Sequence, residues 1–244
     1  MTTTLEDVTK GLRDQILQGL YSPGSKLREA TVSENLGVSR TLARLAMSSL
    51  EHEGLLTREP NRGSRVKVFT IKQIIDAIEV RGEIEAMAVR QVAERGIDDR
   101  TRQALEAQIA LCEAMLRRGV DNEQDRSSWA ASNQDYHDLL IEASGNWALR
   151  IAVDQISNLP LVSASAVIFE RNDPGLRLEQ LKAAHKDHRE ILHAIEGRQG
   201  HRGESLMREH AHMNARNKRT NLAQPETMAL ARKLPGGSLI APPA

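Results

Sequence analysis

Long stretches with the spacing of amphipathic helices fill most of the chain after residue 69. Apolar residues recur there every three or four positions, which is the period of one face of an α-helix. Glycines separate these stretches and mark expected helix ends. We expect six helices at about 71–95, 99–118, 124–144, 146–157, 175–197 and 200–221, and a seventh with a weaker pattern near 160–170. Together they predict an all-α antiparallel helical bundle.

Composition agrees with a mainly α protein of more than one domain. Hydrophobic residues make up 40% of the 244 residues, but aromatic residues only 2%. Leu, Ile, Val, Ala and Met must therefore fill the cores, which favours helices packed on helices. The length suits two domains.

The sequence excludes some classes of protein. The single cysteine, Cys112, rules out an internal disulfide framework and fits a reducing compartment. The N-terminus lacks the basic start and apolar stretch of a signal peptide, and no segment approaches the ~20 apolar residues of a membrane helix. We therefore expect a soluble, cytoplasmic protein with no membrane partner. Because the formal net charge is zero, any basic face has to be local.

The first 70 residues differ from the rest in having short elements and frequent turns. Thr4 and Ser39 stand where helix N-caps are expected, and Gly54 stands where a helix should end. A hairpin turn at 60–63 separates two short runs of strand-forming residues. We expect helices at about 5–20, 31–36 and 40–53 and strands at 55–57 and 64–68. This order predicts an N-terminal winged helix-turn-helix.

The helix that starts at Arg40 has the residues needed to read DNA. Arg40, Thr41 and Arg44 occupy its first two turns, and an arginine fork matches phosphate or the O6/N7 edge of guanine. Positions 40 to 69 include six basic residues and three acidic ones, and this excess of positive charge predicts a local basic surface. Arg62 and Gly63 at the hairpin tip can enter the minor groove or straddle the backbone. On spacing alone, the same arginines also fit an ordinary solvated surface.

This part of the chain resembles the winged-helix head of the GntR family of bacterial repressors. The resemblance is carried by 27–29, 36–41, Arg44, 50–51, 53–56 and 62–63. It implies binding to double-stranded operator DNA, with contacts from Arg28, Ser39, Arg40, Thr41, Arg44, Arg62 and Gly63. Three positions depart from the family pattern: Leu45 replaces a common acid, Leu42 a frequent proline, and Ala30 an arginine of some members. These departures bear on the operator sequence.

Three histidines are spaced so that one polar pocket can form inside the bundle. Asn133 lies four residues before His137, so both project from one helix face. His188 and His210 belong to two successive helices, which antiparallel packing across a short connection brings together. Three imidazoles and an oxygen donor suit a zinc-like or nickel-like ion. Histidines scattered over helices are also common as surface or core residues, and spacing alone leaves that alternative open.

The second part of the chain looks like the FCD effector domain of the FadR-type branch of that family. The resemblance spans about 70–215 and is carried by 79–81, Glu85, 136–137, 145–146, 187–189, 191–192, 194–195 and 207–210. In that family an Asp and three His commonly hold a divalent metal, and a small carboxylate effector binds at or beside it. The corresponding residues are Asn133, His137, His188 and His210, with a neutral amide in place of the family's carboxylate.

Arg81 resembles the family's arginine that faces the effector pocket. A guanidinium there can pair bidentately with a carboxylate of the effector. The alternative is a surface ion pair with Glu83 or Glu85. The resemblance thus implies an effector site made by Arg81 and the four residues named for the metal.

The working hypothesis is a ligand-responsive transcriptional regulator. We expect a DNA-binding domain at 1–69, an effector-binding and dimerisation domain at 70–222, and a flexible tail at 223–244. A homodimer, or a tetramer of two dimers, holds a pseudo-palindromic operator of a catabolic or transport operon, and a small organic acid releases it. The alternatives are a metal-dependent helical hydrolase and a metal sensor without an organic ligand.

Overall fold

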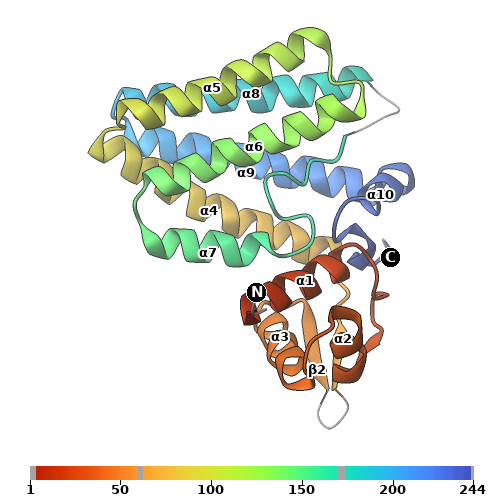
Figure 1. Ribbon diagram of the computed structural model, residues 1–244. Coiled ribbons are helices and arrows are strands. Elements are labelled where there is room, and N and C mark those ends of the chain that lie inside the picture. The colour runs from red at the N-terminus through yellow and green to blue at the C-terminus, as the bar shows by residue number, and fades with distance from the viewer. Residues whose placement is uncertain (1–3, 60–62, 170–173, 243–244) are drawn as a thin grey trace.

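The N-terminal part of the molecule is a small head of three helices and a three-stranded sheet. The computed structural model describes residues 4–59, 63–169 and 174–242. The antiparallel sheet has the order β1-β3-β2. In Figure 1, α1 lies on the side of the head next to the rest of the molecule, and the β2–β3 hairpin points away from it. The elements are α1 (Leu5–Leu17), β1 (Lys26–Leu27), α2 (Glu29–Leu36), α3 (Arg40–His52), β2 (Leu56–Glu59) and β3 (Gly63–Val66).

Local sequence explains where α2 ends and α3 begins. Gly37 ends α2 in the left-handed conformation at φ 64°, which glycine adopts without strain. Two residues later, the Ser39 side chain accepts a hydrogen bond from the backbone N–H of Leu42 and caps α3. The buried face of α3 consists of Ala43, Ala46, Met47 and Leu50. The opposite face of α3 is therefore left to solvent.

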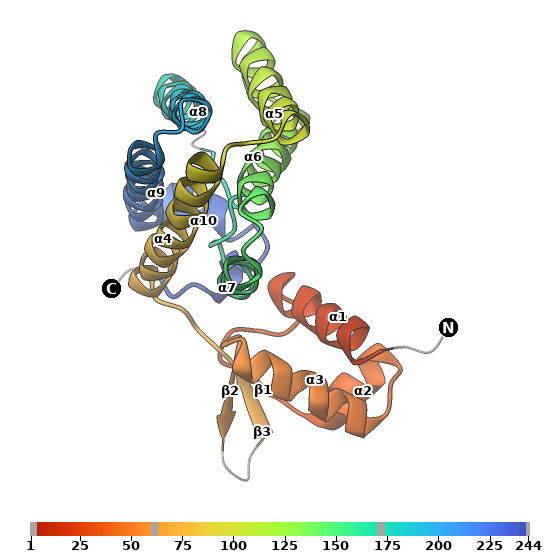
Figure 2. The same ribbon diagram turned by 90° about the vertical axis from the view of Figure 1, so that its left-hand side faces the viewer.

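The rest of the molecule is a helical bundle, seen end-on in Figure 2. Its helices are α4 (Ile71–Arg95), α5 (Asp99–Arg118), α6 (Glu123–Ala143), α7 (Trp147–Ser157), α8 (Pro174–Glu196) and α9 (Gly200–Ala223). Helices α4 and α9 pack closely, since a Cβ at Gly82 would lie 2.3 Å from the Cβ of Ala211. The predicted fold class, a winged helix-turn-helix followed by an all-α bundle, is confirmed. No helix in the described ranges is long and apolar enough to cross a bilayer.

The helix expected near 160–170 does not form in the described part of that range. Residues 158–169 run as turns and extended backbone instead, with Leu161 at a positive φ of 58°. Pro160 disfavours helical backbone at the residue before it. Side chains from three helices then bind the carbonyl oxygens of the segment: Arg81 binds Val162, Asn133 binds Ala164, and Lys218 binds Leu161 and Ala166. These bonds replace those of a helix.

The described part of the expected flexible tail, residues 223–242, is instead folded against the core, so that expectation needs correction there. They form α10 (Pro225–Ala231) and a short 3₁₀ turn, η1 (Gly237–Leu239). Leu239 and Ile240 are buried. The backbone of Phe69 donates to Leu239 at 2.8 Å and accepts from Ala241 at 2.8 Å, and Gly236 donates to Leu17 of α1 at 2.7 Å. The prolines and glycines therefore make turns that direct apolar side chains inward.

One hydrophobic core continues from the head into the bundle. It includes Leu12 and Leu50 of the head, Ile78 of α4, Leu161 of the irregular segment and Leu222 of α9. The head is thus packed against the bundle as well as linked to it. The division at residue 69 into separate domains remains a prediction.

Candidate functional site

The exposed face of α3 presents the residues predicted to read DNA. Arg40, Thr41 and Arg44 are all exposed. Leu45 lies one helical turn after Thr41 on the same face, and its side chain is 46% exposed. A large apolar side chain that is nearly half exposed lies on the same face as the arginines. It is available to a partner.

The other predicted DNA contacts lie around this helix. Arg28 is exposed at the N-cap of α2, where it makes no side-chain capping bond. Gly63 is exposed at the start of β3. Ser39 is exposed, and the role visible for it is capping α3. Arg62 lies outside the described residues. The structure thus brings Ser39, Arg40, Thr41 and Arg44 together and places Arg28 and Gly63 on neighbouring elements.

Three histidines meet inside the bundle. His137 comes from α6, His188 from α8 and His210 from α9, and all three are buried. One ring nitrogen from each lies within 4.8 Å of the others. The centroid separations of the rings are 5.4 Å, 5.5 Å and 4.8 Å. The structure therefore brings together the three histidines that the sequence predicted to share a pocket.

Neighbouring side chains fix how these rings are turned. The Nδ1 of His137 lies 3.0 Å from the Glu85 carboxylate, and the Nδ1 of His210 lies 3.2 Å from that of Asp187. Tyr136 stacks on His188 at 4.0 Å, and its hydroxyl donates to the backbone carbonyl of His188 at 2.9 Å. The Nε2 atoms of all three histidines are buried and have no hydrogen-bond partner among the described residues.

The electrostatics of the cluster favour neutral rings beside a charged carboxylate. Burial lowers the pKa of His137, and it lowers the pKa of His188 well below its usual range. A neutral imidazole is the form that ligates metal. Burial alone would raise the pKa of Glu85, but the charge of Arg81, together with His137 and His210, lowers it to about 2. Glu85 is therefore an anion at neutral pH.

Asn133 lies one turn before His137 on α6 and is buried. Its amide nitrogen donates to the carbonyl of Ala164 at 2.8 Å. Because the amide nitrogen makes that bond, the amide oxygen is left to accept a hydrogen bond or to ligate an ion. The role of Asn133 as a ligand remains a prediction.

Arg81 forms the ion pair with Glu85 that the sequence left open as an alternative, and its role toward the effector remains a prediction. It is 2% exposed, so its ion pair with Glu85, at 3.2 Å, is buried and not on the surface. Its guanidinium also donates to the carbonyl of Val162. Arg81 lines a small cavity on the far side of His137, together with Glu85. The carboxylate of Glu85 therefore already neutralises the charge of Arg81.

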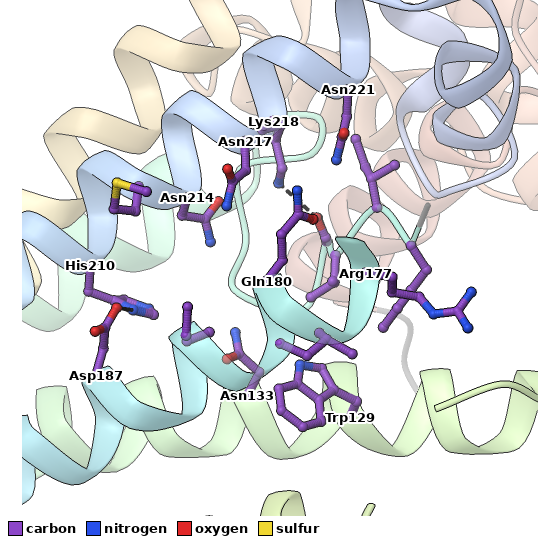
Figure 3. Close-up of a pocket in the computed structure, with 18 of the residues that line it drawn as sticks. Trp129, Asn133, Arg177, Gln180, Asp187, His210, Asn214, Asn217, Lys218 and Asn221 are labelled. Carbon is purple, nitrogen blue, oxygen red and sulfur yellow. Dashed lines mark hydrogen bonds and ion pairs between the residues drawn. The ribbon is translucent and has the colours of Figure 1, made fainter. Parts of the chain in front are cut away.

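A larger cavity of about 430 Å³ lies beside the histidine cluster (Figure 3). His210 and Asp187 lie at one end of it in Figure 3, and Asn133 also lines it. One face of α9 gives it a polar wall, with residues spaced four, three, one and three positions apart: His210, Asn214, Asn217, Lys218 and Asn221. Further polar residues come from α8 and from Glu209 of α9; those on α8 are Arg177, Gln180, Lys186 and Asp187. Its apolar wall includes Trp129, Val167, Phe169 and Leu181.

Sequence reasoning missed several residues of this site. It considered Glu85 only as a surface partner of Arg81, and it assigned no role to Asp187 or Tyr136. Lys218 was also missed, although the recurrence of polar residues on the His210 face of α9 was visible in the sequence. Lys218 is buried, and its burial, aided by the charge of Arg81, lowers its pKa to about 7.

A winged helix-turn-helix with an exposed basic helix, joined to a bundle that encloses a cavity and a histidine cluster, defines a ligand-responsive DNA-binding regulator. Comparison with known families agrees. Residues 4–66 match the family described as bacterial regulatory proteins, gntR family, and residues 76–213, more than half of the chain, match the FCD domain. The chain belongs to the gntR family of regulators that have an FCD domain. It is a transcriptional regulator and not an enzyme.

Individual relatives share this organisation. The chain is 25% identical to the HTH-type transcriptional repressor GlaR of Escherichia coli over 86% of this chain and 93% of that protein. It is 28% identical to the uncharacterized HTH-type transcriptional regulator YdhC of Bacillus subtilis, over 61% of this chain and 64% of that protein. Among solved structures, E. coli McbR/YncC has the same fold, with a TM-score of 0.61 at 18% identity and coverage of 89% and 98%.

Proposed function

We propose that this regulator is a repressor that a small organic acid releases from its operator. The observation that carries this proposal is that His210 belongs both to the buried histidine cluster and to the wall of the 430 Å³ cavity. A ligand in the cavity therefore meets whatever the histidines hold. The relative GlaR is named a transcriptional repressor, which supports repression over activation.

On DNA, Arg40, Thr41 and Arg44 read base edges and phosphates in the major groove. Their exposure on one face of α3 supports this role. Arg28, Ser39, Arg62 and Gly63 contact the backbone or the adjacent minor groove. Two copies of the chain form a homodimer in the cytoplasm, and their two heads bind a pseudo-palindromic operator, since half-site spacing follows dimer symmetry.

The residues of the cluster fit a divalent cation, zinc or nickel. Three buried Nε2 atoms have no partner among the described residues, and two of the rings have a carboxylate beside Nδ1: Asp187 is hydrogen-bonded to His210, and Glu85 lies 3.0 Å from His137. A carboxylate beside the second ring nitrogen is usual for a metal-binding imidazole. His137, His188 and His210 would hold the ion, with the amide oxygen of Asn133 as a fourth ligand. Because all four ligands are neutral, the ion would keep its full charge and would attract a carboxylate.

Arg81 has a supporting role in this proposal. It neutralises Glu85, which in turn orients His137. Its effect on the effector is therefore exerted through the metal site, and not through direct pairing with the effector's carboxylate. The acid itself enters the larger cavity from the side of His210 and Asn133.

Fluorescence anisotropy with DNA selected from a random pool by the protein tests the DNA-binding part. Arg44→Ala removes a fork of the kind that contributes about 1–3 kcal/mol to base recognition, so we expect roughly 5- to 150-fold weaker binding with the dimer intact. Arg100→Ala, an exposed arginine on α5, is the matched control and should bind normally. Equal affinity of Arg44→Ala and the wild type would contradict the assignment.

Elemental analysis of the purified chain tests the metal-binding part. The wild type should contain one zinc or nickel per chain, and His188→Ala should contain far less. His193→Ala, an exposed histidine on the same helix, should be unchanged. If metal alone shifted the DNA affinity and no acid changed it further, the chain would be a metal sensor.

A further inference from the structure

We infer that Lys218 forms a second binding subsite in the cavity and selects a dicarboxylate as the effector. This inference rests on the proposed function and names its ligand more closely. The first carboxylate of the ligand would meet the histidine cluster. The second would meet the Lys218 ammonium group at the other end of the polar wall on α9 (Figure 3).

Among the residues that the structure describes, Lys218 is bonded to backbone carbonyl oxygens and not to a carboxylate. Its side chain is 6% exposed, and its Nζ donates to the carbonyls of Leu161 and Ala166, each at 2.7 Å. No carboxylate of the described residues forms an ion pair with it, and the nearby charge that acts on it is the positive Arg81. A buried cation without a counter-ion is costly. A carboxylate that enters the cavity would supply one.

The Nζ atom has the capacity to bind such a ligand. An ammonium group has three N–H donors, and two of them are used by the carbonyls of Leu161 and Ala166. The third is left for a group in the cavity, which Lys218 lines. A charge-assisted hydrogen bond to a carboxylate is about twice as strong as a neutral one. Lys218 therefore favours an acid over a hydroxyl or an amide.

The shape of the cavity sets the length of the ligand. Lys218 lies eight residues after His210, about 12 Å along the helix axis at 1.5 Å per residue. The lysine side chain and a histidine-bound ion would each reach into that span, so a ligand that bridges them would be short. Trp129, Phe169 and Leu181 offer apolar surface to the methylene groups, and Asn214 and Asn217 lie between the two ends.

Binding at Lys218 would also reach the head. The carbonyls that now hold Nζ belong to the irregular segment 158–169, whose Leu161 and Val162 pack in the core shared with the head. A ligand carboxylate that accepts from the third N–H would pull on Nζ and, through it, on those two carbonyls. The segment would then shift, and the packing of the head would shift with it.

Calorimetric titration of the zinc-loaded full chain tests this inference. The probes are the saturated dicarboxylates of four, five and six carbons, each paired with the monocarboxylate of the same length, and gluconate as a polyhydroxylated monoacid. The wild type should bind one diacid at least ~10-fold more tightly than its matched monoacid. Lys218→Met should lose that preference. Lys218→Arg should retain the preference, and Lys182→Met, an exposed lysine on α8, should behave as the wild type.

The outcomes separate this inference from the proposed function. If monoacids or gluconate bind the wild type as tightly as the diacids, or if Lys218→Met keeps the preference, the Lys218 subsite is wrong while the organic-acid effector stands. If no acid binds the wild type, the effector class itself is wrong and the subsite falls with it. If Lys218→Met does not fold, the affinities of the wild type for diacids and for matched monoacids, together with those of Lys218→Arg, still test the Lys218 subsite.

Discussion

Replacing Glu85 by Gln tests the buried charge chain that orients the metal site. The carboxylate of Glu85 is 2% exposed and lies between the guanidinium of Arg81 and the ring of His137. Its pKa falls from an ordinary 4.5 to about 2, and a fall of that size corresponds to about 3 kcal/mol of stability at neutral pH. Removing one member of a buried ion pair costs roughly 3–5 kcal/mol in other proteins. The lowered pKa of Glu85 and the loss of a buried ion pair therefore predict a similar loss of stability.

The expected result for Glu85→Gln is therefore a loss of about 3 kcal/mol in the free energy of unfolding of the metal-free protein. For a chain of this size that loss lowers the Tm by roughly 6–12 °C. The folded pKa of Glu85 is below the unfolded one, so its contribution is complete above about pH 4.5 and disappears as the pH falls toward 2. The difference between the variant and the wild type should shrink over the same interval.

Urea denaturation followed by circular dichroism, in chelator at pH 7 and pH 4, measures this difference. Glu83→Gln is the matched control, because Glu83 is exposed and pairs with Arg208 at the surface. Exposed pairs contribute about 0–1 kcal/mol, so this variant should be close to the wild type. If Glu85→Gln changed stability by no more than Glu83→Gln, the buried pair would not have the role given to it here.

Three further predictions concern other parts of the molecule. Burial lowers the pKa of His137 and His188 below 6.5, so below about pH 6.5 the unfolded chain takes up protons before the folded one does. The metal-free protein should therefore lose stability as the pH falls below that value. Denaturation curves between pH 5 and 8 measure this loss, and a pH-independent stability would contradict the prediction. Leu45→Ala should weaken operator binding wherever Leu45 meets a thymine methyl group, so replacing that thymine by deoxyuridine should weaken the wild type and not the variant; equal sensitivity of both proteins would contradict this contact. Leu239→Ala should lower the free energy of unfolding by about 2–5 kcal/mol, because Leu239 is fully buried. Leu20→Ala, at an exposed position, should lower it by under ~0.5 kcal/mol. Similar losses in the two variants would mean that the C-terminal segment is not part of the core.

Much of the fold follows from local sequence because each helix signals its own ends. Gly37 and Ser39 mark the turn between α2 and α3, and the short apolar period of α3 fixes which face is buried. The exposure of Arg40 and Arg44 then follows. Likewise, Asn133 and His137 share a face of α6 because they are four residues apart.

The rest could not be predicted because distant partners decide it. Segment 158–169 takes its shape from carbonyl bonds to Arg81, Asn133 and Lys218, which lie on three other helices. The C-terminal residues after Gln224 look mobile by composition, yet Phe69 and Leu17 give their backbone fixed partners. The burial of Arg81 beside Glu85 depends on how α4 packs in the bundle. None of these partners can be identified from spacing alone.

The central claim is that a ligand at the histidine cluster releases the head from DNA. Fluorescence anisotropy of a selected operator, bound by zinc-loaded wild type and by His188→Ala, tests it most directly when each complex is titrated with an organic acid that binds the wild type. Both proteins should bind the operator with similar affinity before the acid is added, and only the wild type should be released. Release of His188→Ala at the same acid concentration would show that the cluster does not sense the effector.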